Sequence, residues 1–298
     1  MNYSRIIFVS TFLLAALFCA ISTASCANSS KQESSDPVEQ QDAVSAISRD
    51  SLVTLMLNDL HGIDNLEKYT EMYERQSAAV KSYWNGSHQG EDQVRMIETV
   101  FNEFNSLSDS LGGGSTVDMM QSGEIMCAMY RYMTANEYCG KYRDNQLYQE
   151  EMRDWLQLEN GLNEFYSNLA QVAYWRGSIV NVIISGTMYH LAEVRHTDYL
   201  QLFKGGKFAE SSMPITEART NLIQEINDAR SVEVEDDADE DFKQVLTALN
   251  KSGDRVVELL DKWLVSRNKL CESLGIPESH TASLIDQFSR KIQEIIEN

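Results

Sequence analysis

The sequence predicts an all-α protein built from one or two antiparallel helical bundles, with no substantial sheet. Only three prolines occur, Pro37, Pro214 and Pro277, and proline is the residue that helix interiors tolerate least. Alternation of apolar and polar residues, the mark of a half-buried strand, is absent from the sequence. Apolar residues instead recur at three- and four-residue spacing, which is the spacing of one helix face.

The N-terminal segment predicts a secretory signal peptide over residues 1–25. Arg5 is the only charged residue before Lys31, and residues 6–21 are almost purely apolar. This run is short for a spanning helix, which needs about 20 apolar residues. A basic start, a short apolar stretch and small residues after it are typical of a signal peptide.

The end of this segment predicts a lipid anchor at Cys26. The residues Thr23-Ala24-Ser25-Cys26 resemble the lipobox of bacterial lipoproteins, although Thr23 stands where Leu is usual. The alternative is ordinary cleavage near Ala27 with an unmodified Cys26. Residues 26–42 are polar, rich in Ser and Gln and without periodicity, so we expect a disordered tether.

The rest of the chain divides into a helical bundle over 43–204 and a C-terminal helical segment over 205–298, packed on the first as one domain or standing apart. Glycine-marked breaks lie at residues 85–92, 111–116 and 204–207, as expected at helix ends. Asp64 with Glu67 three residues later predicts an N-terminal capping box. The acidic run 232–242 predicts a loop or a frayed helix start. The apolar run 179–194 is interrupted by polar residues and predicts a buried helix.

The charge balance limits the classes of partner. The formal net charge is −20 at pH 7, and it becomes −21 when residues 1–25, with Arg5 as their only charge, are removed. This argues against nucleic acid, because phosphate binding depends on Lys and Arg. It also argues against electrostatic docking on anionic lipid, so we expect membrane contact only through the anchor. Such a charge would attract a cationic partner. The alternative is that it serves only to keep the protein soluble.

The cysteines allow one disulfide at most. Cys19 leaves with the signal segment, and Cys127, Cys139 and Cys271 remain for an oxidising compartment. On one straight helix, Cys127 and Cys139 would stand about 18 Å apart, beyond the roughly 7 Å limit between bridged Cα atoms. They can pair only if the chain turns between them, near residues 134–137. Otherwise one of them would meet Cys271, and the pairing stays open.

A sequence pattern occurs twice, in "RDWLQLENGLNEFY" (153–166) and "DKWLVSRNKLCESL" (261–274). Each has Trp-Leu, then Asn, Leu and Glu at matching positions. In the later copy, Trp263, Arg267 and Cys271 stand four residues apart and form one stripe on a helix. We expect Trp263 to stack on Arg267 and to lie in the core with its apolar neighbours.

The stripe of Trp263, Arg267 and Cys271 is similar to the signature of the LprI-type lysozyme-inhibitor family, which are small helical envelope proteins. A second element of that family, Leu-Asn-x-x-Tyr-x-x-Leu, is matched by Leu162, Asn163, Tyr166 and Leu169. The order differs from the family, since this element precedes the complete stripe by about a hundred residues. The earlier copy also has Glu159 and Asn163 where Arg and Cys are expected. The resemblance covers about thirty residues and implies binding of a lysozyme.

Catalytic and metal-binding patterns are absent from the sequence. His190, Glu193 and His196 include one Glu-x-x-His, whereas a di-iron site in a bundle needs two. His190 and His196 also lie about 240° apart on a helix, so they do not share a face. Neither a Gly-x-Ser-x-Gly nor a His-Glu-x-x-His pattern occurs. We therefore expect no metal, no cofactor and no catalytic site.

Together these observations predict a non-enzymatic binding protein, lipid-anchored in a bacterial cell envelope on its periplasmic or surface face. Its expected partner is a cationic protein such as a lysozyme. The alternatives are a structural or assembly lipoprotein and a hydrolase whose site has no recognisable motif.

Overall fold

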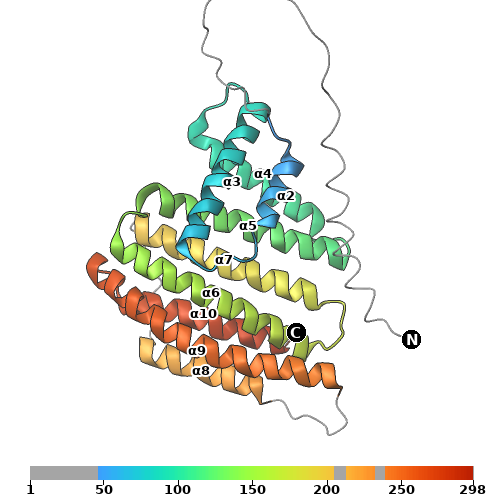
Figure 1. Cartoon of the computed structure of the whole chain (residues 1–298), viewed down its shortest axis with the longest axis vertical. Coiled ribbons are helices and arrows are strands. Elements are labelled where there is room, and N and C mark those ends of the chain that lie inside the picture. The colour runs from blue at the N-terminus through green and yellow to red at the C-terminus, as the bar shows by residue number, and fades with distance from the viewer. Residues whose placement is uncertain (1–45, 205–212, 232–238, 298) are drawn as a thin grey trace, which may run out of the picture. The chain divides into compact units, whose positions relative to one another are not determined.

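A computed structural model describes residues 46–204, 213–231 and 239–297, and these residues form nine α-helices and no strand (Figure 1). The all-α prediction is therefore confirmed. The helices are α2 (Arg49–Asn58), α3 (Leu66–Ser87), α4 (Met96–Leu111), α5 (Thr116–Lys141), α6 (Gln146–Ala173), α7 (Val180–Lys204), α8 (Ile215–Arg230), α9 (Glu240–Leu274) and α10 (Glu278–Glu297), with a short 3-10 turn, η2 (Gln93–Arg95), before α4.

Most helix ends coincide with the breaks that the sequence predicts. Helix α3 ends inside the 85–92 segment, α4 ends at the glycines after Leu111, and α7 ends at Lys204. Helix α9 ends at Gly275, whose φ of 67° is the left-handed conformation that glycine adopts without steric cost. The Gly275 N–H then bonds to the carbonyls of Cys271 and Glu272, which would otherwise lack partners.

The capping box expected at Asp64 is wrong by one residue. Asn65 is the N-cap of α3: its backbone is extended and its side chain accepts a hydrogen bond from the Lys68 N–H at 3.0 Å. Asp64 instead pairs with the Lys68 ammonium at 2.8 Å. A complete capping box occurs at the start of α5, where the side chains of Ser115 and Asp118 each accept from the other's backbone N–H.

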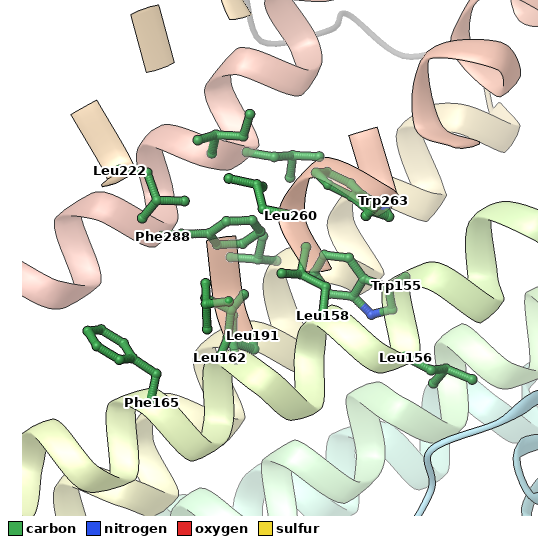
Figure 2. Packing of buried hydrophobic residues seen from close by; sticks show 14 of the residues in the cluster. Trp155, Leu156, Leu158, Leu162, Phe165, Leu191, Leu222, Leu260, Trp263 and Phe288 are labelled. Carbon is green, nitrogen blue, oxygen red and sulfur yellow. The ribbon is translucent and has the colours of Figure 1, made fainter. Parts of the chain in front are cut away.

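The helices pack in pairs, α5 on α7, α6 on α9 and α8 on α10. Helices α6 and α9 run antiparallel, because Glu164 pairs with Arg255 near one end while Glu150 pairs with Lys269 near the other. This arrangement brings the two Trp-Leu patterns together. The ring centres of Trp155 and Trp263 lie 5.7 Å apart in an edge-to-face contact. Figure 2 shows the two side chains in the core.

Two hydrophobic cores result from this pairing. One lies mainly between α6, α8, α9 and α10, and Trp155, Trp263 and Phe288 meet in it (Figure 2). The other lies among α2, α3, α4 and α5. Helix α7 contributes to both, with Leu191 in the first core and Met188 in the second. The predicted buried helix over 179–194 is thus the element shared by the two cores.

The described residues belong to one compact unit, which contains helices from both predicted segments, 43–204 and 205–298. Within it, α9 from the second segment packs along α6 from the first. None of the helices that the structure describes is long and apolar enough to span a membrane. The signal segment, Cys26, the tether and residues 232–238 of the acidic run lie outside the described residues.

Candidate functional site

A pocket of about 200 Å³ lies between α7 and α10. Its α7 wall consists of residues three or four apart, which therefore share one helix face, and its α10 wall is built in the same way. The α7 residues are His190, Glu193, Val194, Thr197, Asp198 and Gln201, and the α10 residues are His280, Ser283, Leu284 and Gln287. Only Val194 and Leu284 are apolar, so the pocket is suited to a polar group.

A network of buried ionic side chains lies directly beneath the pocket and begins at Glu151 of α6. Its carboxylate accepts hydrogen bonds from Arg195 at 2.5 and 2.8 Å, and from the indole N–H of Trp263 at 2.8 Å. The Tyr199 hydroxyl donates to it at 3.4 Å. Glu151 has no exposed surface, so these donors replace the water that a carboxylate would otherwise require.

Asp198 of α7 is the second anion of the network and forms the floor of the pocket. It pairs with Arg267 of α9 at 2.5 and 3.0 Å, and with Arg195 at 3.0 Å. His280 Nε2 lies 2.8 Å from Asp198 Oδ1, the oxygen that Arg267 Nη2 also binds. The network therefore joins α6, α7, α9 and α10 through two carboxylates and two guanidinium groups whose charges cancel.

The charges in this network shift the pKa of Asp198. Burial alone would raise the pKa of this carboxyl, but Arg267, the hydrogen bond with His280 and Arg195 together lower it well below its usual value. Asp198 therefore stays ionised near neutral pH. Because both guanidinium groups already bind its oxygens, Asp198 is a positioning element for His280 and not a free base.

The predicted stripe of Trp263, Arg267 and Cys271 lies in the core. Trp263 and Arg267 have no exposed surface, and Cys271 is 4 % exposed. The Arg267 guanidinium lies 5.7 Å from the Trp263 ring centre, within the range of cation–π contact. The stripe thus contributes packing and the Asp198 ion pair, and none of its side chains is available to a partner.

The second family-like element is also largely internal. Leu162, Tyr166 and Leu169 are at most 2 % exposed, and the Tyr166 hydroxyl donates to the Phe288 carbonyl at 3.1 Å. Asn163 is half-buried, and its side-chain oxygen is buried without a hydrogen-bond partner.

The earlier Trp pattern carries a buried ion pair of the opposite polarity. Glu159, at the position that Arg267 occupies in the later pattern, binds Arg131 of α5 at 3.0 and 3.1 Å. The guanidinium carbon of Arg195, on α7, lies 4.5 Å from the centre of the Trp155 ring, so the cation–π partner of Trp155 comes from another helix.

Cys127, Cys139 and Cys271 are free thiols. Cys127 and Cys139 both lie on α5, which continues through residues 134–137. The turn that would let them pair is therefore absent, because this stretch is uninterrupted helix.

The three candidate metal ligands do not gather at one place. His190 and Glu193 line the α7–α10 pocket, whereas His196 contacts the Tyr130 ring and lies 3.5 Å from the Thr134 hydroxyl. In the part of the chain that the structure describes, no group of three or more His, Cys, Asp or Glu is placed to bind a metal ion.

Sequence reasoning missed Glu151, Arg195, Asp198 and His280. One signal was available, because Arg267 stands on an apolar stripe of α9 and a buried guanidinium requires a carboxylate partner. Which of the 45 acidic residues supplies it depends on how the whole bundle places α7 relative to α9, and helix periodicity alone does not contain that information.

Comparison with known proteins gives no match: neither a family model, nor a curated protein, nor a solved structure resembles this chain.

Proposed function

We propose that this protein is a non-enzymatic binding protein of a bacterial cell envelope, held there by a lipid on Cys26, and that it captures a cationic protein. The observation that carries the proposal is the distribution of charge. The buried ionic side chains of the described residues are Arg131, Arg195, Arg267, Glu151, Glu159 and Asp198. These three cations and three anions cancel, so the core accounts for none of the net charge of −20.

The excess negative charge therefore lies outside the core. Exposed carboxylates occur on several helices, among them Glu71 of α3, Glu98 of α4, Glu217 of α8 and Glu258 of α9. A broad negative surface attracts cations at long range and raises association rates. A lysozyme is the first partner to test, because the Trp263, Arg267 and Cys271 stripe resembles that of LprI-type lysozyme inhibitors.

The binding test separates a specific partner from general charge attraction. Lysis of bacterial cell walls by lysozyme is measured with the chain lacking residues 1–26, at low salt and at physiological salt. Exposed ion pairs contribute about 0–1 kcal/mol each and weaken when the screening length falls to roughly 8 Å. Inhibition that persists at physiological salt supports the proposal. Inhibition that disappears, or that an unrelated protein of similar charge reproduces, contradicts lysozyme as the partner.

The proposed location is tested separately by fractionation. In a bacterium that processes lipoproteins, we expect the full chain in the membrane fraction and its Cys26→Ser variant in the soluble fraction. Incorporation of labelled fatty acid should occur only in the parent chain. A soluble parent chain that begins at Ala27 would contradict the lipid anchor and leave the binding proposal open.

A further inference from the structure

We infer that the α7–α10 pocket, which His190 and Glu193 line, binds one protonated amine or guanidinium group, with Glu193 supplying the charge that attracts it. The inference stands on the pocket's own geometry. If the bound group is a side chain of a protein partner, the inference deepens the proposed function. Only this assignment to a protein partner rests on the proposed function.

His190 lines the pocket as a neutral ring. Burial lowers its pKa most and the positive charge of Lys291 lowers it further, whereas the carboxylates of Glu294 and Glu193 oppose this only in part. The ring is therefore neutral near pH 7 and carries one N–H. A neutral ring does not repel a cation that enters the pocket beside it.

Glu193 stands one turn along the same face of α7 and provides the pocket with negative charge. Its carboxylate accepts a hydrogen bond from the Tyr130 hydroxyl at 3.4 Å. The other carboxylate of the pocket, Asp198, already binds Arg195, Arg267 and His280. No cation of the described residues forms an ion pair with Glu193, and Lys291 pairs with Glu294 at 2.9 Å. A carboxylate without a cationic partner in a polar pocket favours a ligand that carries positive charge and N–H donors.

The volume of the pocket limits the size of its ligand. At about 200 Å³ it is smaller than the roughly 300–1,000 Å³ pockets of drug-sized ligands. The end of a lysine or arginine side chain, or a small free amine, has a volume that fits this pocket. Val194 and Leu284 would contact the methylene groups, as apolar surface does along the stems of Lys and Arg.

The test compares a cation with a neutral molecule of similar shape on the unmodified protein. Butylammonium chloride and n-butanol are titrated separately onto the chain lacking residues 1–26, and the imidazole signals of His190 are followed by NMR. We expect butylammonium to shift these signals in a saturable manner and to bind at least tenfold more tightly than butanol. Equal binding of the two, or no saturable shift with butylammonium, would overturn the inference.

Two variants with the same change in charge localise the site. Glu193→Gln removes the pocket carboxylate, whereas Glu258→Gln removes an exposed carboxylate of α9 that does not line the pocket. We expect the affinity for butylammonium to fall about tenfold in Glu193→Gln and to change less than twofold in Glu258→Gln. Equal losses would show a general charge effect and overturn the assignment. Circular dichroism verifies that both variants are folded. The comparison of butylammonium with butanol uses the unmodified protein and does not depend on either variant.

The source of the cationic group is decided by repeating the comparison with lysozyme. Weaker binding of lysozyme to Glu193→Gln than to Glu258→Gln would assign the pocket to a side chain of the protein partner. If only butylammonium distinguishes the variants, the natural ligand is a free amine. If lysozyme binds none of the chains while butylammonium still binds, lysozyme fails as the partner and the pocket assignment stands.

Discussion

At the scale of single residues, the buried ionic network is the feature that distinguishes this core from a purely apolar one. Arg267 and Glu151 have no exposed surface, and each depends on the other helices for its partners. Removing one partner of a buried ion pair leaves an uncompensated charge and costs about 3–5 kcal/mol. Single substitutions at this site should therefore affect stability more than equivalent changes on the surface.

Trp263→Ala should lower the free energy of unfolding by about 3–5 kcal/mol, because it opens a cavity beside Trp155 and Phe288 and removes the indole donor of Glu151. Urea unfolding followed by circular dichroism measures this change. Val265→Ala, two residues along α9 and 59 % exposed, is the control and should change stability by less than about 0.5 kcal/mol. A similarly small effect at Trp263 would place its side chain outside the core.

The thiols should react slowly in the folded protein. Burial raises the pKa of Cys127 to about 12 and that of Cys139 to about 11, and it also raises the pKa of Cys271. The thiolate is the reactive form, so little of it is present at pH 8.

A thiol reagent such as DTNB, applied to the chain lacking residues 1–26, should label the three thiols slowly in buffer and rapidly in urea. Two thiols unreactive in urea until a reductant is added would reveal a disulfide and contradict the free-thiol state.

At the scale of helices, the periodicity of apolar residues predicted the fold class better than capping residues predicted where each helix begins. Proline scarcity and three-four spacing predicted the helical class, because each helix must bury one apolar face whatever its partner. The sequence predicts Asp64 as the N-cap of α3, whereas the structure has Asn65, since both residue types cap helices and the choice depends on which backbone is extended. The α7–α10 pocket could not be predicted, because its two walls come from helices that no sequence pattern pairs.

The close approach of α5 and α7 gives a prediction at this scale. A Cβ atom added to Gly123 of α5 would lie 3.0 Å from the Ser185 hydroxyl and 3.1 Å from its backbone carbonyl carbon. Because backbone cannot rotate away, Gly123→Val should push the helices apart and destabilise the protein by about 1–3 kcal/mol.

Gly140→Val is the matched control in the same helix. A Cβ atom there meets nothing within 4 Å, and Val favours a helix slightly over Gly. Thermal unfolding should show a lower Tm for Gly123→Val and an unchanged or slightly higher Tm for Gly140→Val. Equal behaviour of the two variants would contradict the close approach of α5 and α7.

At the scale of the whole molecule, internal neutrality and external acidity have different consequences. The network beneath the pocket joins four helices that come from both predicted halves of the chain, 43–204 and 205–298. Disrupting it should weaken the compact unit as a whole. The external charge instead repels itself, so added salt should favour the compact state while it weakens attraction to a cationic partner.

The whole-molecule prediction concerns acid. The pKa of Asp198 lies below its unfolded value, chiefly because Arg267 opposes the effect of burial. Such a carboxyl contributes stability that is present above the unfolded pKa of about 4 and is lost as pH falls toward the folded pKa. We therefore expect the free energy of unfolding, measured in urea, to fall as the pH is lowered from about 4.

Asp198→Asn separates this contribution from the general effect of protonating a very acidic surface. The variant should be about 3–5 kcal/mol less stable near pH 7, because Arg195 and Arg267 lose their shared anion. Its stability should then decline less steeply than that of the parent chain below pH 4, since one coupled proton uptake is gone. Asp109→Asn, an exposed carboxylate of α4, should keep the parent slope. A parent slope retained in Asp198→Asn would mean that acid sensitivity arises at the surface and that Asp198 is not the ionised centre of the network.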